Sequence, residues 1–123
     1  MRKKVLVVDD SLSAREEVSA ALEPAGFEVL HAADGVDGLN KIRNSDDLAV
    51  VVADINMPEM SGLEMLAQVK REERWAALPI VVLTTEGHPE LIRQAKSTGA
   101  RGWMVKPFKP DLLVALVRKL AGV

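Results

Sequence analysis

Apolar and polar residues follow two distinct patterns along the chain. Short aliphatic runs bounded by polar residues, Gly or Pro are typical of buried strands. Stretches with apolar residues three and four positions apart are typical of helices that bury one face. The aliphatic runs predict strands at residues 4–8, 28–31, 49–53, 80–83 and 102–105. An amphipathic stretch follows each run, which predicts helices in strict alternation with the strands.

Residues at the expected helix ends have the chemistry of helix caps. Ser11 or Ser13 can cap the first helix, and Ser13 with Glu16 fits a capping box. Asp34 can cap the second helix. Pro110 lies near the first turn of the last helix, where its missing N–H costs least. These positions support the predicted boundaries.

Strands that alternate with helices favour a parallel sheet covered by helices on both faces. Right-handed crossovers leave few topologies for such a chain. We expect a flavodoxin-like (βα)5 fold of the α/β class, a doubly wound parallel sheet with strand order 2-1-3-4-5. Residues 1–123 have the length of one domain, and we expect a single domain without an output domain.

Composition narrows the class of protein. The formal net charge of −2 argues against a general nucleic-acid binder. No apolar stretch approaches the roughly 18 residues of a membrane span, and we find no signal peptide. We therefore expect a cytoplasmic monomer that binds neither nucleic acid nor a membrane.

Charge is distributed unevenly along the chain. Residues 1–85 contain 9 Lys or Arg and 15 Asp or Glu, whereas residues 86–123 contain 7 Lys or Arg and 3 Asp or Glu. The imbalance has two interpretations. It is either an ordinary solvated surface or a cationic face that docks an acidic segment of a partner protein.

Three carboxylates follow two strands that the predicted topology places side by side. Asp9 and Asp10 come after the first strand, and Asp54 comes after the third. In such sheets ligands bind beyond the carboxyl ends of the strands, where the strand order reverses. Clustered carboxylates raise each other's pKa values by repulsion, and Mg²⁺ resolves this because it prefers a few carboxylates plus waters. The pattern predicts an Mg²⁺ site and argues against a nucleotide-phosphate cradle.

Further polar residues follow the neighbouring strands at the same edge. Thr84 ends the fourth strand, and its hydroxyl can donate to an oxyanion. Lys106 ends the fifth strand, and its ammonium can neutralise charge that develops near the carboxylates. Asn56 and Glu86 are polar and lie two residues beyond Asp54 and Thr84, where both can orient a water.

Four segments of the chain, VVDD, ADINMPEMSG, VVLTTEG and GWMVKPF, resemble the signatures of the receiver domain of two-component response regulators. The similarity covers nearly the whole chain and is to the CheY-like, single-domain type. It implies that Asp54 is the phosphoryl acceptor. It also implies that Asp10 and Asp54 bind Mg²⁺, with Asp9 acting directly or through water and the backbone carbonyl of Asn56 as a further ligand.

The resemblance extends to the groups around the acceptor. It implies that Thr84 and Lys106 contact the phosphoryl oxygens and that Trp103 occupies the aromatic switch position on the output face. Two residues depart from the usual pattern. Trp103 stands where Tyr or Phe is more common, and Thr85 stands where a smaller residue is usual. Both departures bear on rates and switch amplitude rather than on the acceptor chemistry.

The function expected from this resemblance is a phosphorylation-activated signalling switch. A sensor histidine kinase or a small acyl phosphate supplies the phosphoryl group. The fourth helix, fifth strand and fifth helix then change their surface to control a downstream target protein, as in chemotaxis. Such a protein is not an enzyme beyond catalysing its own phosphorylation and dephosphorylation.

Two alternatives remain open from the sequence. A metal-dependent phosphatase with an aspartyl nucleophile would use similar chemistry, but that class typically places D-x-D after its first strand. A pseudo-receiver would bind partners without being phosphorylated. The complete polar set argues against it: Asp9, Asp10, Asp54, Thr84 and Lys106.

Overall fold

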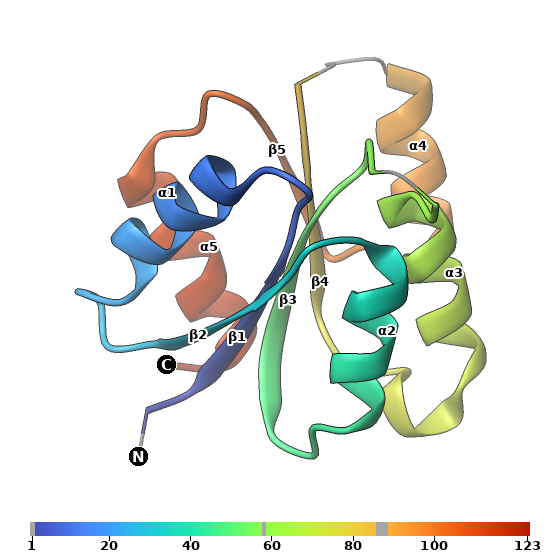
Figure 1. Cartoon of the computed structure of the whole chain (residues 1–123), viewed down its shortest axis with the longest axis horizontal. Coiled ribbons are helices and arrows are strands. Elements are labelled where there is room, and N and C mark those ends of the chain that lie inside the picture. The colour runs from blue at the N-terminus through green and yellow to red at the C-terminus, as the bar shows by residue number, and fades with distance from the viewer. Residues whose placement is uncertain (1, 58, 86–88) are drawn as a thin grey trace.

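Parallel strands form the central layer of the protein in a computed structural model that describes residues 2–57, 59–85 and 89–123 (Figure 1). The strand order is β2-β1-β3-β4-β5, which confirms the predicted flavodoxin-like topology. The strands are β1 (Lys4–Val8), β2 (Glu28–Ala32), β3 (Leu48–Asp54), β4 (Ile80–Thr84) and β5 (Gly102–Val105).

Helices cover both faces of this sheet. Helices α1 and α5 lie on one face, and α2, α3 and α4 lie on the other (Figure 1). The helices are α1 (Leu12–Leu22), α2 (Gly35–Arg43), α3 (Gly62–Arg71), α4 (Pro89–Thr98) and α5 (Pro110–Ala121), with a short 3-10 helix, η1 (Glu73–Trp75), after α3. Among the described residues, no helix combines the length and the apolar character that crossing a bilayer requires.

Alternate residues of the central strands belong to two different cores. Val5 and Val7 of β1 pack in a cluster with residues of α1 and α5. Leu6 and Val8 of the same strand pack in a cluster with residues of α2 and α3. Because both faces of the sheet are covered, the strands appear in the sequence as continuous apolar runs rather than as alternating ones.

The structure extends three predicted strands by one or two residues. Strand β2 continues to Ala32, β3 runs from Leu48 to Asp54, and β4 continues to Thr84. The register explains where these strands end, because Ala32 pairs with Val8, Asp54 pairs with Leu83, and Thr84 pairs with Val105. Asp54 and Thr84 are therefore the last residues of strands.

Helix caps agree with the sequence prediction in part. Ser11 caps α1, because its Oγ accepts a hydrogen bond from Ala14 N at 3.3 Å. The capping box predicted for Ser13 and Glu16 is wrong, since α1 begins at Leu12 and Ser13 is already helical. Asp34 caps α2 as predicted, and Pro110 is the first residue of α5.

A close approach joins the start of α3 to the end of β3. Gly62, the first residue of α3, lies so near the strand that an added Cβ would be 2.2 Å from the carbonyl oxygen of Asp54. Its N–H donates a hydrogen bond of 3.0 Å to the carbonyl oxygen of Ile55. Glycine at this position lets the helix start directly against the last residue of β3.

Candidate functional site

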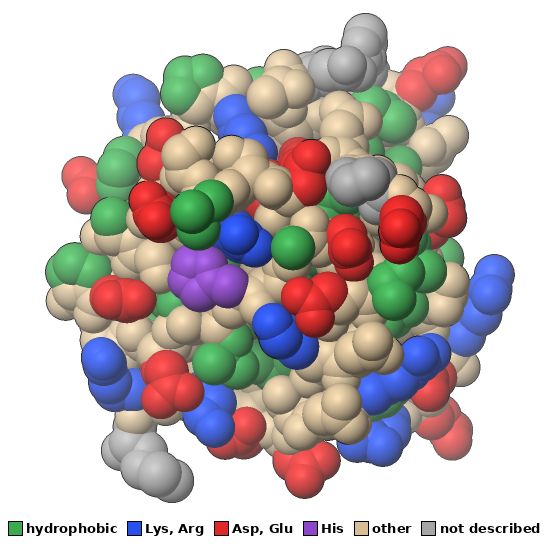
Figure 2. Space-filling model, viewed as in Figure 1, with side chains coloured by type: hydrophobic (Ala, Val, Ile, Leu, Met, Phe, Trp, Pro, Cys, Tyr) green, Lys and Arg blue, Asp and Glu red, His purple; other side chains and the backbone are tan. Residues whose placement is uncertain are grey.

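Carboxylates gather at the carboxyl edge of the sheet, between β1 and β3. Asp9 directly follows β1 and is buried, Asp10 is exposed beside it, and Asp54 is the buried last residue of β3. One carboxylate oxygen from each of the three residues lies within 4.8 Å of the other two. Figure 2 shows acidic side chains at several places on this face, interspersed with Lys and Arg, and some of them lie in its upper half, where the strands end.

Lys106 reaches this crevice from the end of β5. Its Nζ donates to Asp9 Oδ2 at 2.7 Å and lies 3.6 Å from Asp54 Oδ1. The other oxygen of Asp9 accepts a hydrogen bond of 2.9 Å from the backbone N–H of Ser11. Asp9 is thus fixed through both oxygens, and Lys106 brings one cation to two carboxylates.

Burial and charge change the proton affinity of two groups in the crevice. Burial raises the pKa of Asp54 above its ordinary value of 3.8; the charge of Lys106 lowers it, and the charges of Asp9 and Asp10 raise it further. Burial lowers the pKa of Lys106, but its hydrogen bond to Asp9 and the charges of Asp54 and Asp9 leave it raised overall. The carboxylate of Asp54 is therefore costly in this site, whereas the ammonium of Lys106 is favoured.

Thr84 lies at the same edge as the carboxylates. It is fully buried at the end of β4, in register with Val105 of β5. Its carbonyl oxygen accepts a hydrogen bond of 2.8 Å from the backbone N–H of Lys106. This bond fixes the point at which Lys106 leaves β5.

The ligand atoms in the crevice suit a hard divalent cation. They are carboxylate oxygens, which Mg²⁺ prefers together with water. In the described part of the chain, Asp9, Asp10 and Asp54 form the one group of three or more acidic or histidine side chains close enough to share an ion.

Comparison with known proteins identifies the family. The family model of the response regulator receiver domain matches residues 5–118. The chain belongs to this family. The chemotaxis protein CheY1 of Helicobacter pylori is 39% identical over 120 residues, which cover 97% of each chain. The CheY homologue of Campylobacter jejuni is 36% identical over 97% of this chain and 92% of its own.

A solved structure has the same fold and much of the same sequence. The chemotaxis response regulator CheY4 of Vibrio cholerae superimposes with a TM-score of 0.90 in one of its structures. The two chains are 42% identical, and the match covers 98% of this chain and 99% of the other. The receiver domain described here is thus a CheY-type member of its family.

Family membership settles the class of function. Receiver domains of this type act in phosphorylation-dependent two-component signalling, and this one is a signalling protein. They generally bind Mg²⁺ at an acidic pocket and interact with histidine kinases and downstream targets. These findings do not favour the alternative of an aspartyl phosphatase.

Trp103 lies apart from the acidic crevice of the receiver domain, on the edge strand β5. Its side chain is 36% exposed, and Lys96 Nζ of α4 lies 4.2 Å from the centroid of its ring. The sequence predicted a functional role for Trp103 on a face that also carries Lys96, but not the direct contact between the two. That contact depends on how α4 lies against β5, which no local pattern records.

Two further residues singled out in the sequence, Asn56 and Thr85, lie in loops that follow β3 and β4. Asn56 is exposed, two residues beyond Asp54, and Thr85 is exposed directly after β4. Glu86 lies outside the described residues. Sequence reasoning also missed the close approach of Gly62 to Asp54, although a glycine shortly after an acidic strand end is a signal of close backbone approach.

Proposed function

We propose that Asp54 is the phosphoryl acceptor of this receiver domain. One observation carries the proposal: Asp54 is buried at a strand end, next to two other carboxylates and 3.6 Å from the ammonium of Lys106. An ionised carboxylate in such a place costs free energy until positive charge is added around it. A site of this kind favours a reaction that brings a cation and a phosphoryl group together.

The proposed transfer is a displacement at phosphorus. A carboxylate oxygen of Asp54 attacks the phosphorus atom of a phosphohistidine on a sensor kinase, or of a small acyl phosphate. The bond between phosphorus and the donor's nitrogen or oxygen breaks, and the donor keeps the electron pair. The product is an acyl phosphate on Asp54, which water later hydrolyses to a carboxylate and inorganic phosphate.

Asp9, Asp10, Asp54 and the backbone carbonyl of Asn56 are the residues that would hold Mg²⁺. When bound, the ion supplies positive charge to the phosphoryl oxygens and to the attacking carboxylate. The fit rests on the three clustered oxygens of the acidic side chains. Of these residues, Asp9 is already fixed by Lys106 and by the N–H of Ser11, and it would contact the ion directly or through water.

Residues around the acceptor would complete the site. Lys106, already a neighbour of Asp54, would shift from Asp9 toward a phosphoryl oxygen, since its raised pKa keeps it charged. The hydroxyl of Thr84 would donate to another phosphoryl oxygen. Asn56 and Glu86 would orient the water that ends the signal and so set its lifetime. This receiver would thereby catalyse its own phosphorylation and dephosphorylation.

The output surface would consist of α4, β5 and α5. Trp103, Val105 and Leu112 are large apolar side chains exposed in this part of the molecule. Exposed cations lie in the same segment: Arg93, Lys96, Arg101, Lys109, Arg118 and Lys119. Aromatic and basic side chains favour an interface with an acidic segment of a target protein.

The setting of this switch follows from its relatives. Those from Helicobacter pylori, Campylobacter jejuni and Vibrio cholerae are named as chemotaxis proteins, so we place the switch in a chemotaxis pathway. It would act in the cytoplasm as a monomeric single domain over residues 1–123, with a sensor histidine kinase upstream and a target protein downstream.

Acetyl phosphate with Mg²⁺ tests the acceptor directly. Intact-protein mass spectrometry should detect one added phosphoryl group on the wild-type chain and none on Asp54→Asn. The matched control is Asp46→Asn, which removes an exposed carboxylate at the opposite edge of the sheet and should label like wild type. Equal labelling of a folded Asp54→Asn protein would exclude Asp54 as the acceptor, and no labelling of wild type would favour a pseudo-receiver.

A further inference from the structure

Trp103 and Lys96 form a contact that the acceptor chemistry does not use. Lys96 is exposed on α4, and its Nζ lies 4.2 Å from the centroid of the Trp103 ring. A cation over the face of an indole is attracted by the negative charge of its π-system, and Trp is the best aromatic partner. Within residues 2–57, 59–85 and 89–123, no carboxylate forms an ion pair with Lys96. The indole is thus the observed partner of this charge.

The strand alternation explains why the ring lies on the α4 side. Gly102 of β5 lies against Leu116 of α5, and Met104 packs with the core beneath α1 and α5. Trp103 lies between them in the strand and so points to the other face. It pairs with Val82, which packs with Ala95 of α4.

Trp103 is weakly held in this position. It is 36% exposed on an edge strand, so one side of the ring has no strand beside it. Trp75 offers a comparison within the same chain. Arg74 lies 4.3 Å from the centroid of the Trp75 ring, but Trp75 is only 8% exposed and packs in the core beneath α2 and α3. Packing fixes Trp75, whereas Trp103 is held by less packing and by the contact with the cation.

We infer that Lys96 is a positioning residue that holds the Trp103 ring outward in the unphosphorylated state. This inference rests on the proposed role of Trp103 as the switch residue. As the switch residue, Trp103 would turn its ring inward when Asp54 is phosphorylated, and that turn would break the contact with Lys96. The contact therefore opposes the active conformation. Its strength sets what fraction of the protein adopts that conformation before phosphorylation. An exposed cation–π contact is weak enough to be broken, because it shifts an equilibrium by about two- to fivefold.

Nuclear magnetic resonance of the phosphoryl-free protein tests the positioning role without any phosphorylation. In wild type, the ε-methylene protons of Lys96 should be shifted upfield by the ring current of Trp103. Side-chain couplings of Trp103 should report a mainly outward rotamer. Lys96→Gln should raise the ratio of inward to outward rotamer about two- to fivefold. Lys96→Arg should preserve the wild-type ratio, because a guanidinium also binds the ring face.

Arg93→Gln is the matched control for Lys96→Gln. It removes one positive charge from an exposed position of the same helix, about one turn away. If the rotamer ratio follows net charge on α4 rather than the contact, Arg93→Gln will match Lys96→Gln and the inference fails. An unchanged ratio in Lys96→Gln also overturns it, as does an unshifted methylene signal in wild type.

Fluoroberyllate with Mg²⁺, a probe that mimics a phosphoryl group, tests the link to the switch. Lys96→Gln should bind it about two- to fivefold more tightly than wild type, because a larger fraction of the variant already has the inward rotamer of Trp103. If Lys96→Gln has an altered rotamer ratio but binds fluoroberyllate as wild type does, Lys96 positions the ring without affecting the switch. That result would overturn the proposed link between the contact and activation. Absence of fluoroberyllate binding to wild type would instead count against the acceptor site, while the rotamer measurement would still decide the role of Lys96.

Discussion

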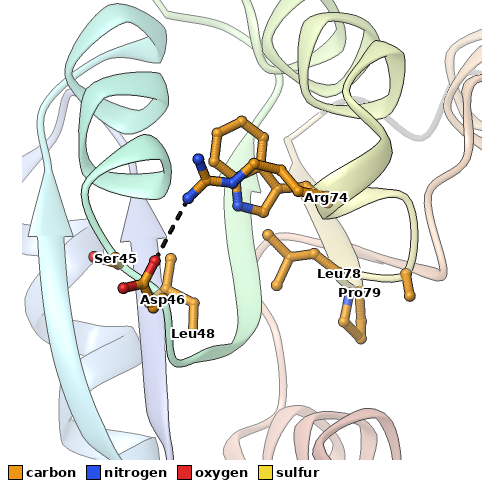
Figure 3. A pocket seen from close by; sticks show the side chains of 8 residues that line it. Ser45, Asp46, Leu48, Arg74, Leu78 and Pro79 are labelled. Carbon is orange, nitrogen blue, oxygen red and sulfur yellow. Dashed lines mark hydrogen bonds and ion pairs between the residues drawn. The ribbon is translucent and has the colours of Figure 1, made fainter.

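The two edges of the sheet use their charged residues in opposite ways. At the carboxyl edge, three carboxylates share a crevice and one lysine lies between two of them. At the amino edge, charges pair one to one: Lys4 with Asp47 at 2.9 Å and Arg74 with Asp46 at 3.5 Å. Figure 3 shows the second pair beside an open pocket of about 310 Å³.

A third cation of the amino edge stabilises backbone rather than another side chain. Lys70 Nζ lies 3.4, 3.1 and 2.6 Å from the carbonyl oxygens of Trp75, Ala76 and Leu78, in the connection from α3 to β4. The amino edge thus uses charge to hold connections together. The carboxyl edge keeps an imbalance of charge that a ligand can relieve. One edge serves stability and the other serves function.

Gly62→Ala should cause the largest loss of stability, and it acts at the carboxyl edge. The new Cβ would lie 2.2 Å from the carbonyl oxygen of Asp54, so α3 or the end of β3 must move. We expect a loss of about 3 kcal/mol in the free energy of unfolding, measured by urea denaturation. Gly26→Ala is the control, since its Cβ would meet no atom within 4 Å although its φ is +100°. It should cost only about 1 kcal/mol, and equal losses would contradict the close approach.

Lys70→Met should cause the next largest loss, at the amino edge. Three carbonyl oxygens would lose their charged donor while the aliphatic part of the side chain remains. We expect a loss of about 1–3 kcal/mol, with labelling by acetyl phosphate unchanged. Arg71→Met, at the exposed neighbouring position, should change stability little. A labelling defect in folded Lys70→Met would show that the two edges are not independent.

Asp54→Asn should have the opposite effect on stability in the absence of Mg²⁺. The folded-state pKa of Asp54 is raised, chiefly by burial, so its carboxylate costs stability wherever it is ionised in the fold. The variant should therefore melt at a higher temperature than wild type at neutral pH. Its advantage should shrink as the pH falls through the folded pKa and vanish below the unfolded value of 3.8.

Mg²⁺ should change the difference in stability between wild type and Asp54→Asn. Millimolar Mg²⁺ should raise the melting temperature of wild type more than that of Asp54→Asn, because the wild-type site binds the ion more tightly. The advantage of the variant should then decrease or reverse. A constant difference between the two proteins at all Mg²⁺ concentrations would contradict a metal site at Asp54.

The sheet and the carboxylate crevice could be predicted from the sequence because their signals are local. Each strand is a short apolar run, and each site residue stands at the end of one. Parallel topology then brings Asp9, Asp54 and Lys106 to one edge, although 97 positions separate Asp9 from Lys106. The sequence could not show that Lys106 bonds Asp9 at 2.7 Å and stays 3.6 Å from Asp54, since that depends on side-chain packing.

Other features depend on how whole elements pack, and sequence patterns do not record this. The Lys96 contact with Trp103 joins a helix to a strand, and the three carbonyl groups around Lys70 come from an irregular connection. The sequence left the choice between Ser11 and Ser13 as cap open for a smaller reason. Both serines have the right chemistry, and the residue at which the backbone turns helical decides between them.

Arg74→Gln should have the smallest measurable effect, although Arg74 makes two contacts at the amino edge. Its side chain is 57% exposed and that of its partner Asp46 is 95% exposed, so water competes for the ion pair and salt screens it. Its guanidinium also lies 4.3 Å from the Trp75 ring centroid, which is worth about 0.5–1 kcal/mol at an exposed position. We expect a loss within that range and no change in the burial of Trp75, which core packing holds. Asp46→Asn should cost nothing measurable, so that the two variants together separate the ring contact from the ion pair.

A loss in Arg74→Gln as large as that in Lys70→Met, or a shift of Trp75 emission toward that of an exposed indole, would show that the cation rather than the core fixes this tryptophan. In that case the contrast drawn here between Trp75 and Trp103 would fail.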